Sequence, residues 1–389
     1  MKKTWPFTFN LLFFGGFAFV APFLVPYYRS LGLDGVQIGL LTGITPLVTM
    51  AAATFWTGLA DSAQRHKLIM STALIGGILA LLIFPFISAF LLILGIAVIF
   101  NIFFGPVTSL ADSAAMHMLG AGKEHYGRIR LGGTLGFGLM APLAGWLIMK
   151  YGLNLAFWGA ASMFSLALMV SWKLVHNPAH RTAFTGGKFR PLLTDRRWII
   201  FLTIALLGGA AVPMQINYFY PYLRELGADE ALTGIALMHG TLLEIPIFFL
   251  GSRLLKRFGS YPLLVFAMVM SGVRLILFGL AATPASVLVI QFASGFVFPA
   301  MWLVGVTYAD ENAPPGLSAT AQGLFAAMIF GFGSAVGGIA GGLLLEGVGG
   351  RGMNMVFGII LLAALALIIP LGGRGMASPP APVFEEVSP

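Results

Sequence analysis

The sequence predicts an all-α integral membrane protein in which twelve transmembrane helices form two six-helix bundles. Three observations predict it: the composition, the number of apolar stretches and an internal repeat. Hydrophobic residues make up 58% of the 389 residues, and charged residues only 9%. Soluble domains carry about 25% charged residues, so this chain cannot cover a water-facing surface of ordinary size. It has no cysteine, which excludes a disulfide framework and a thiolate metal site.

Apolar stretches long enough to cross a membrane follow one another along the chain. About twenty apolar residues cross the roughly 30 Å of hydrocarbon. The stretches lie near 5–28, 36–60, 68–88, 90–117, 130–150 and 153–172, and near 198–223, 231–251, 261–281, 284–309, 317–344 and 352–372. We therefore expect an N-terminal bundle over 1–172, a cytoplasmic linker over 173–197, a C-terminal bundle over 198–373 and a disordered tail over 374–389.

An internal repeat relates the two predicted bundles. Residues 26–39 read PYYRSLGLDGVQIG and residues 221–234 read PYLRELGADEALTG, with seven of fourteen positions identical at an offset of 195 residues. Six spans are an even number, so both halves enter the membrane from the same side and form a parallel repeat. In a chain this apolar, paired halves indicate a transporter with its substrate site at their interface.

The basic residues predict the orientation. Seventeen lysines and arginines fall on or near one side, Arg29, Lys150, Arg224 and Arg351 fall on the other, and Arg274 lies within a span. Short cytoplasmic loops are rich in these residues, so we expect both termini in the cytoplasm and a bacterial cytoplasmic (inner) membrane location. The net charge of +8 then reflects membrane topology and not nucleic-acid binding.

Two acid–arginine pairs are predicted inside the spans. Charged side chains are energetically costly there and usually have a function. Asp112 and Arg130 lie equally far from the turn at residues 120–122, and Glu244 and Arg274 lie equally far from Gly259. Equal distance from a turn means equal depth on adjacent antiparallel helices. Each pair either locks neighbouring helices together or couples a proton to transport. Glu244, the only carboxylate deep within a span, is our candidate proton carrier, with Arg274 and Asp112 assisting it.

Other polar residues complete the candidate site. The amides Asn101, Gln215, Asn217 and Gln291 are candidate substrate contacts, together with Asp112 and Arg130, although an amide in a span also commonly bonds a neighbouring helix. Asp61 and Arg65 are candidates for a latch on the cytoplasmic face. Glycines concentrate at residues 132–145 and 331–342, which predicts a surface of close helix packing that permits rocking. His176 and His180 flank Pro178 in the predicted linker, which favours a solvated loop over a metal site.

Two segments resemble the major facilitator superfamily. Residues 61–67 resemble a degraded form of its loop signature, with Ser62 and Gln64 departing from it. Residues 126–137, YGRIRLGGTLGF, are similar to the start of helix 5 in proton symporters of the lactose permease and phenylpropionate permease type. The resemblance implies the twelve-helix fold, and in the lactose permease the residues matching Asp112 and Arg130 hold the sugar.

The same resemblance has departures. Arg274 matches the helix 9 arginine of the lactose permease, but Thr241 stands where that family has its helix 8 acid, and Glu244 follows a turn later. Ser294 and Val297 replace its helix 10 histidine and glutamate. Residues Asn101 with Pro106, Glu244 and Gln291 resemble the phenylpropionate permease group more closely.

The leading hypothesis is a proton-coupled symporter that takes up a small organic solute such as an aromatic or other organic acid or a sugar. Arginines suit a carboxylate, whereas arginines already neutralised by Asp112 and Glu244 leave room for a neutral sugar or nucleoside. The alternative is a proton-driven exporter of drugs or metabolites. An enzyme is disfavoured because no nucleophile–base–acid constellation occurs. We expect a monomer in the lipid bilayer that binds solute and protons, without cofactor, metal or nucleic acid.

Overall fold

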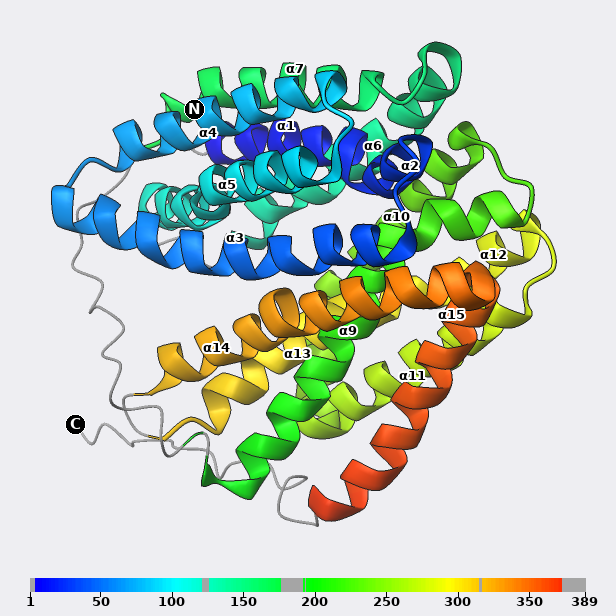
Figure 1. Cartoon of the computed structure of the whole chain (residues 1–389). Helices are drawn as coiled ribbons and strands as arrows, with labels where there is room; N and C mark the ends of the chain where they lie inside the picture. The colour runs from blue at the N-terminus through cyan, green and yellow to red at the C-terminus, as the bar shows by residue number, and fades with distance from the viewer. Residues whose placement is uncertain (1–3, 121–125, 176–191, 193, 315–316, 373–389) are drawn as a thin grey trace, which may run out of the picture.

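The computed structural model describes residues 4–120, 126–175, 192, 194–314 and 317–372 (Figure 1). The described residues form helices and their connections, with no strand among them. The predicted disordered tail, the greater part of the predicted linker with His176 and His180, and most of the predicted turn at 120–122 lie outside the described residues.

Twelve membrane-crossing helical segments account for the described structure. In the first half they are α1 (Thr4–Val20) with η1 (Ala21–Phe23) and α2 (Leu24–Ser30), α3 (Gly35–Ala63), α4 (His66–Ile83) with η2 (Phe84–Phe86), α5 (Phe90–Leu119), α6 (Tyr126–Tyr151) and α7 (Leu155–Ser171). In the second half they are α9 (Arg196–Glu225), α10 (Glu230–Phe258), α11 (Ser260–Leu280), α12 (Pro284–Ile290) with η4 (Gln291–Ala293) and α13 (Ser294–Glu311), and α14 (Ser318–Ala326) with the π-helix η5 (Ala327–Gly333) and α15 (Ser334–Gly372).

Nine of the described helices are long and apolar enough to cross a membrane. The last of them, Thr320–Pro370, has 51 residues and turns back on itself at Gly349, whose φ of 72° and ψ of 177° interrupt α15. Figure 1 shows this turn between the orange and red parts of α15. Counting its two arms separately and adding α7 and α10 gives the twelve predicted spans.

The repeated sequence encodes the same turn and the same helix start in both halves. Gly32 and Gly227 both adopt positive φ, at 80° and 89°, where a side chain would be strained. The aspartates two residues later, Asp34 and Asp229, cap α3 and α10 by accepting hydrogen bonds from the third main-chain N–H of each helix. These positions are shared because the turn and the cap need glycine and aspartate there.

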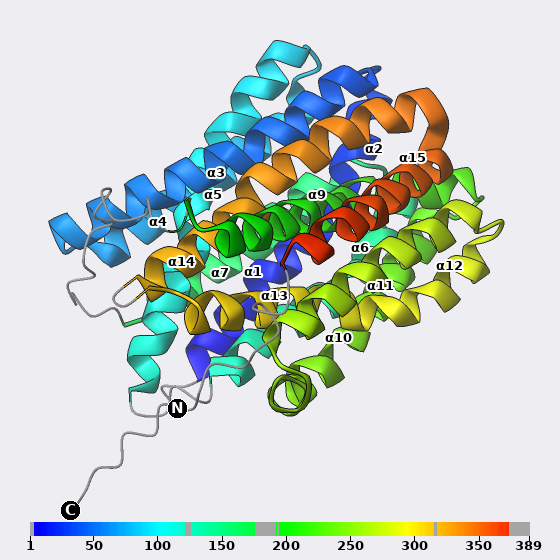
Figure 2. The same cartoon turned by 90° about the horizontal axis from the view of Figure 1, so that it is seen from below.

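The two halves contact each other along two matched helix pairs. Within the halves, α6 packs on α1 and α15 packs on α9; across them, α6 packs on α10 and α15 packs on α3. Figure 2 shows α3, α4 and α5 on one side of the molecule and α10, α11 and α12 on the other. The predicted glycine-rich helices therefore each have one face in their own half and one face against the other half.

Among the described residues, the main chains of the two halves approach most closely at one end of the helices. We call the end that carries Gly32, Gly152, Gly227 and Gly349 the sealed end, and the opposite end, with Gln64 and Gly259, the splayed end. A Cβ built on Gly145 in α6 would collide with the main chain of Glu230. On the same face of α6, a Cβ on Gly138 would lie 3.8 Å from Thr241, and one on Gly127 would meet no described atom within 4 Å.

Glycines and three side chains close the sealed end. A Cβ on Gly39 would lie 3.0 Å from the Ile339 oxygen, so α3 and α15 touch through their main chains. The Tyr218 hydroxyl of α9 donates to the Gly338 oxygen at 2.6 Å and lies 2.9 Å from the Thr42 hydroxyl of α3. The Glu346 carboxylate of α15 accepts a hydrogen bond from the Gly35 amide. Figure 1 shows α3 and α15 converging at this end.

Candidate functional site

The first acid–arginine pair forms as predicted. Asp112 in α5 and Arg130 in α6 approach to 3.9 Å between Oδ1 and Nη1. Arg130 also donates to the Asn10 amide oxygen at 3.4 Å and lies over the Phe14 ring at 4.6 Å. The Tyr126 side chain lies near Asp112. Arg130 of α6 therefore contacts α5 through Asp112 and α1 through Asn10 and Phe14.

This cluster is accessible. The Arg130 and Asp112 side chains are 44% and 35% exposed, so a ligand can reach both charges. An exposed pair of this kind contributes little to stability, about 0–1 kcal/mol.

The second predicted pair is not a direct ion pair. Arg274 in α11 is 7% exposed and donates to the Gln291 side-chain oxygen at 3.4 Å and to the Ser294 hydroxyl. Gln291 in turn donates to the Ala236 oxygen of α10 at 3.3 Å. Arg274, Gln291 and Ser294 thus form a polar network that joins α10, α11 and α13.

Glu244 stands apart from that network. Its carboxylate makes no hydrogen bond and no ion pair within 4 Å to any described residue, and it interacts with Arg274 only at longer range. Equal distance from the Gly259 turn sets equal depth, but it does not set the direction in which each side chain points. Arg274 instead donates from Nη1 to Gln291 of η4 and Ser294 of α13. The Arg274 Nε atom keeps no partner among the described residues.

The four predicted amide contacts lie in three different environments. Asn101 and Asn217 line one cavity of about 160 Å³, whereas Gln291 belongs to the Arg274 network. Gln215 is 6% exposed, and neither its side-chain oxygen nor its nitrogen has a partner in the described part of the chain. His239 contacts the Phe292 ring edge-on with centroids 4.7 Å apart and does not bond Glu244.

The cavity has a member that the sequence analysis missed. Tyr28, at the end of α2, lines it beside Thr42 and Asn217. An aromatic residue near the end of a span is usually interpreted as an interface anchor, and the repeat, which pairs Tyr28 with Leu223, gave no signal for it. The cavity lies mainly between α2, α3 and α5.

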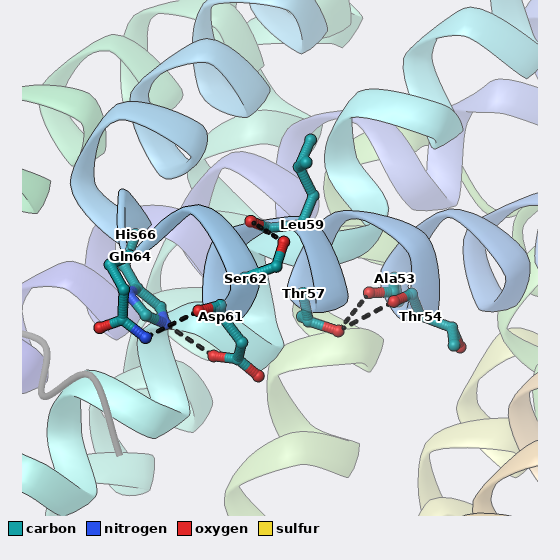
Figure 3. Close-up of polar contacts among 8 residues, drawn as sticks. All are labelled: Ala53, Thr54, Thr57, Leu59, Asp61, Ser62, Gln64 and His66. Carbon is teal, nitrogen blue, oxygen red and sulfur yellow. Dashed lines mark hydrogen bonds and ion pairs between the residues drawn. The ribbon is translucent and has the colours of Figure 1, made fainter. Parts of the chain in front are cut away.

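Asp61, one of the two candidate latch residues, contacts His66 and not Arg65. The Asp61 carboxylate lies 2.7 Å from Nε2 of His66 (Figure 3), a side chain that is 7% exposed. Gln64 adopts positive φ and donates from its side chain to the Asp61 main-chain oxygen at 2.7 Å. This tight turn places the His66 ring, and not the Arg65 guanidinium, against the acid. Asp61 is thus held within its own half at the splayed end.

No group of three or more potential metal ligands occurs among the residues that the structure describes. The polar atoms that it brings together are instead hydroxyls, amides and two separate charged clusters. Such a set can bind and orient an organic solute and can carry a proton, and it supplies no nucleophile–base pair for catalysis.

Comparisons with known proteins agree with this fold. The maltose permease of Geobacillus stearothermophilus is 26% identical over 96% of this chain and 95% of its own length. The multidrug resistance protein MdtG of Salmonella dublin is 27% identical over 73% of this chain and 75% of its own length. The crystal structure of the nucleoside transporter NupG superposes with a TM-score of 0.83 at 18% identity, covering 95% of this chain and 98% of that one.

Fold and relatives define a multi-pass membrane transporter of the major facilitator type, and not an enzyme. The profile of the MFS_1 like family matches residues 7–355. The chain belongs to this family.

Proposed function

We propose that the protein is a proton-coupled symporter that takes up a small organic solute, such as an aromatic or other organic acid or a sugar, by alternating access. The main support is Glu244, whose carboxylate lies within a membrane helix. It has no hydrogen-bonding partner among the described residues and interacts electrostatically with Arg274. Moving an ionised carboxylate out of water is expensive. A carboxylate that gains and loses a proton within the membrane can therefore couple proton movement to the conformational change of alternating access.

We also propose the orientation. Arg29, Lys150 and Arg224 lie at the ends of α2, α6 and α9, and Arg351 follows Gly349, all at the sealed end. The remaining basic residues of the described loops gather at the splayed end, which favours the cytoplasmic side for that end. The protein then sits in a bacterial inner membrane with both termini in the cytoplasm, closed to the outside, and works as a monomer.

The roles divide between the halves. Glu244 carries the proton, and Arg274, held by Gln291 and Ser294, supplies the nearby positive charge. Asp112 and Arg130 present accessible charges to the solute. Asp61 and His66 hold the α3–α4 turn together at the splayed end, where Asp61 is proposed to take part in gating with Arg65.

Replacing Glu244 with glutamine is expected to abolish uphill transport. One pH unit supplies about 1.4 kcal/mol per proton, so one-to-one coupling permits roughly tenfold accumulation. In proteoliposomes with an imposed pH gradient, E244Q should reach only the external solute concentration. Glu311→Gln is the matched control, because Glu311 is an exposed partner of Ser260 at the end of α13. Full accumulation by E244Q would remove Glu244 as the carrier.

Replacing Arg130 with glutamine is expected to weaken solute binding. The change removes the charge facing Asp112 and the donor to Asn10, and a charge-assisted contact of this kind is worth roughly tenfold or more in affinity. Arg128→Gln is the control, since Arg128 is an exposed neighbour on the same helix. KM for uptake should rise in R130Q and stay within about twofold in R128Q. Equal KM values in both variants would contradict the assignment.

The alternative function is proton-driven export of drugs or metabolites. The likeness to MdtG, named a multidrug resistance protein, favours it. Import and export predict opposite directions of solute movement under the same imposed proton gradient, so that direction separates them.

A further inference from the structure

The cavity between α2, α3 and α5 contacts both halves of the protein. Sixteen residues line its volume of about 160 Å³, and all of them except Asn217 of α9 belong to the first half. A molecule held there touches α9 as well as the first half. It can therefore bias the change between conformations.

Most polar side chains around the cavity are already satisfied. Thr42, Thr45 and Asn101 all donate to main-chain oxygens of their own helices, at 2.9, 2.8 and 2.8 Å. Two groups are left. Neither the Tyr28 hydroxyl nor the Asn217 amide hydrogen-bonds to any residue that the structure describes.

Of these two residues, Tyr28 gives the stronger indication of a ligand, because its side chain is only 3% exposed. Buried side-chain polar groups in native proteins nearly always have a partner. The Tyr28 hydroxyl has no partner among the described residues and its residue lines the cavity, so it is available to a group held there. Asn217 offers a donor and an acceptor to the same cavity.

Size and charge limit what that group can be. An apolar cavity of about 150 Å³ accommodates benzene, so this one has room for a single six-membered ring. None of its sixteen lining residues is charged, and an ionised group buried there would lack a counter-charge. Phe17, Phe84 and Phe100 supply aromatic surfaces for the apolar face of a ring,.

We propose that this cavity is a subsite for one uncharged, hydrogen-bonding ring of the transported solute, held by the Tyr28 hydroxyl and the Asn217 amide. The inference rests on the proposed function, because it takes the solute of the symporter as the occupant. The proposal predicts that a neutral ring, and not a carboxylate, occupies this subsite. Arg130 and Arg274 remain outside the subsite, with their own partners Asp112, Gln291 and Ser294.

Binding to the purified full chain in detergent tests the proposal without any gradient. The probes are maltose and uridine as neutral ring compounds and 3-phenylpropionate as an anion, each measured by titration calorimetry. At least one neutral probe should bind the wild type. Tyr28→Phe and Asn217→Ala should each weaken that binding about tenfold.

Tyr27→Phe is the matched control. It makes the same chemical change one residue away, but the Tyr27 hydroxyl donates to the Phe84 oxygen at 2.7 Å and does not line the cavity. Its neutral-probe affinity should stay within about twofold of the wild type. Melting temperatures of the ligand-free variants identify any that fail to fold, and the two independent substitutions, Tyr28→Phe and Asn217→Ala, keep the test decisive.

Three results would overturn the proposal: no neutral probe binds, 3-phenylpropionate alone binds, or a neutral probe binds Y28F and N217A as tightly as the wild type. Failure of the proposed function looks different. In that case a neutral probe binds and depends on Tyr28, but a pH gradient does not drive its accumulation.

Discussion

Replacing Gly136 with alanine is expected to destabilise the protein strongly. A Cβ at this position in α6 would collide with the Leu11 oxygen and lie 2.7 Å from the Leu11 carbonyl carbon. The obstacle is main chain of α1, in the same half, so no side-chain rotation removes it. Separating α1 from α6 would break the packing of the whole half.

The expected cost is about 3 kcal/mol, at the upper end for overpacked interiors. It should lower the melting temperature in detergent by roughly 5 °C or more. Gly127→Ala on the same helix is the control, because no described atom lies within 4 Å of its Cβ. A G136A protein that melts with the wild type would show that α1 and α6 are not packed as described.

Replacing Gly342 with leucine is expected to shift the conformation and leave each half folded. A side chain here would collide with Gly35 and Gly39 of α3, and α3 belongs to the other half. The protein can relieve this clash by opening the sealed end. A cost of about 3 kcal/mol on the sealed state changes the ratio of sealed to open molecules by roughly a hundredfold.

The distance between two spin labels at the sealed end measures this shift. Phe86 at the end of η2 and Leu280 at the end of α11 are 75% and 61% exposed, and the chain has no cysteine of its own, so F86C and L280C supply the only thiols. G342L should add a longer distance that dominates the distribution. Gly347→Ala, with no described atom within 4 Å of its Cβ, should leave the distribution unchanged. An unchanged distribution in folded G342L would contradict a seal formed by α3 and α15.

These two glycines show what a sequence can and cannot predict here. The density of glycine in α6 and α15 predicted close packing, and the packing is close at both positions. The density of glycine could not predict that Gly136 faces its own half whereas Gly342 faces the other half. Helical spacing gives the rotation of residues relative to one another, whereas the face that meets each neighbour depends on the assembled bundle.

The same limit explains the two acid–arginine pairs. Counting from the turn sets depth at about 1.5 Å per residue, and this sufficed for Asp112 and Arg130 on the adjacent helices α5 and α6. It failed for Glu244 and Arg274 because the partners of Arg274 come from a third helix region, at Gln291 and Ser294. Tyr28 escaped notice for a related reason, since only the assembled cavity distinguishes its hydroxyl from that of Tyr27.

Proton movement driven by solute alone tests proton-coupled uptake most directly. In proteoliposomes with equal pH on both sides, an inward gradient of maltose, uridine or 3-phenylpropionate is applied, and a pH-sensitive dye reads the external medium. Symport predicts that the medium becomes alkaline with one of these solutes and that E244Q abolishes the change. Acidification, or solute entry by the wild type with no pH change, would contradict proton-coupled uptake.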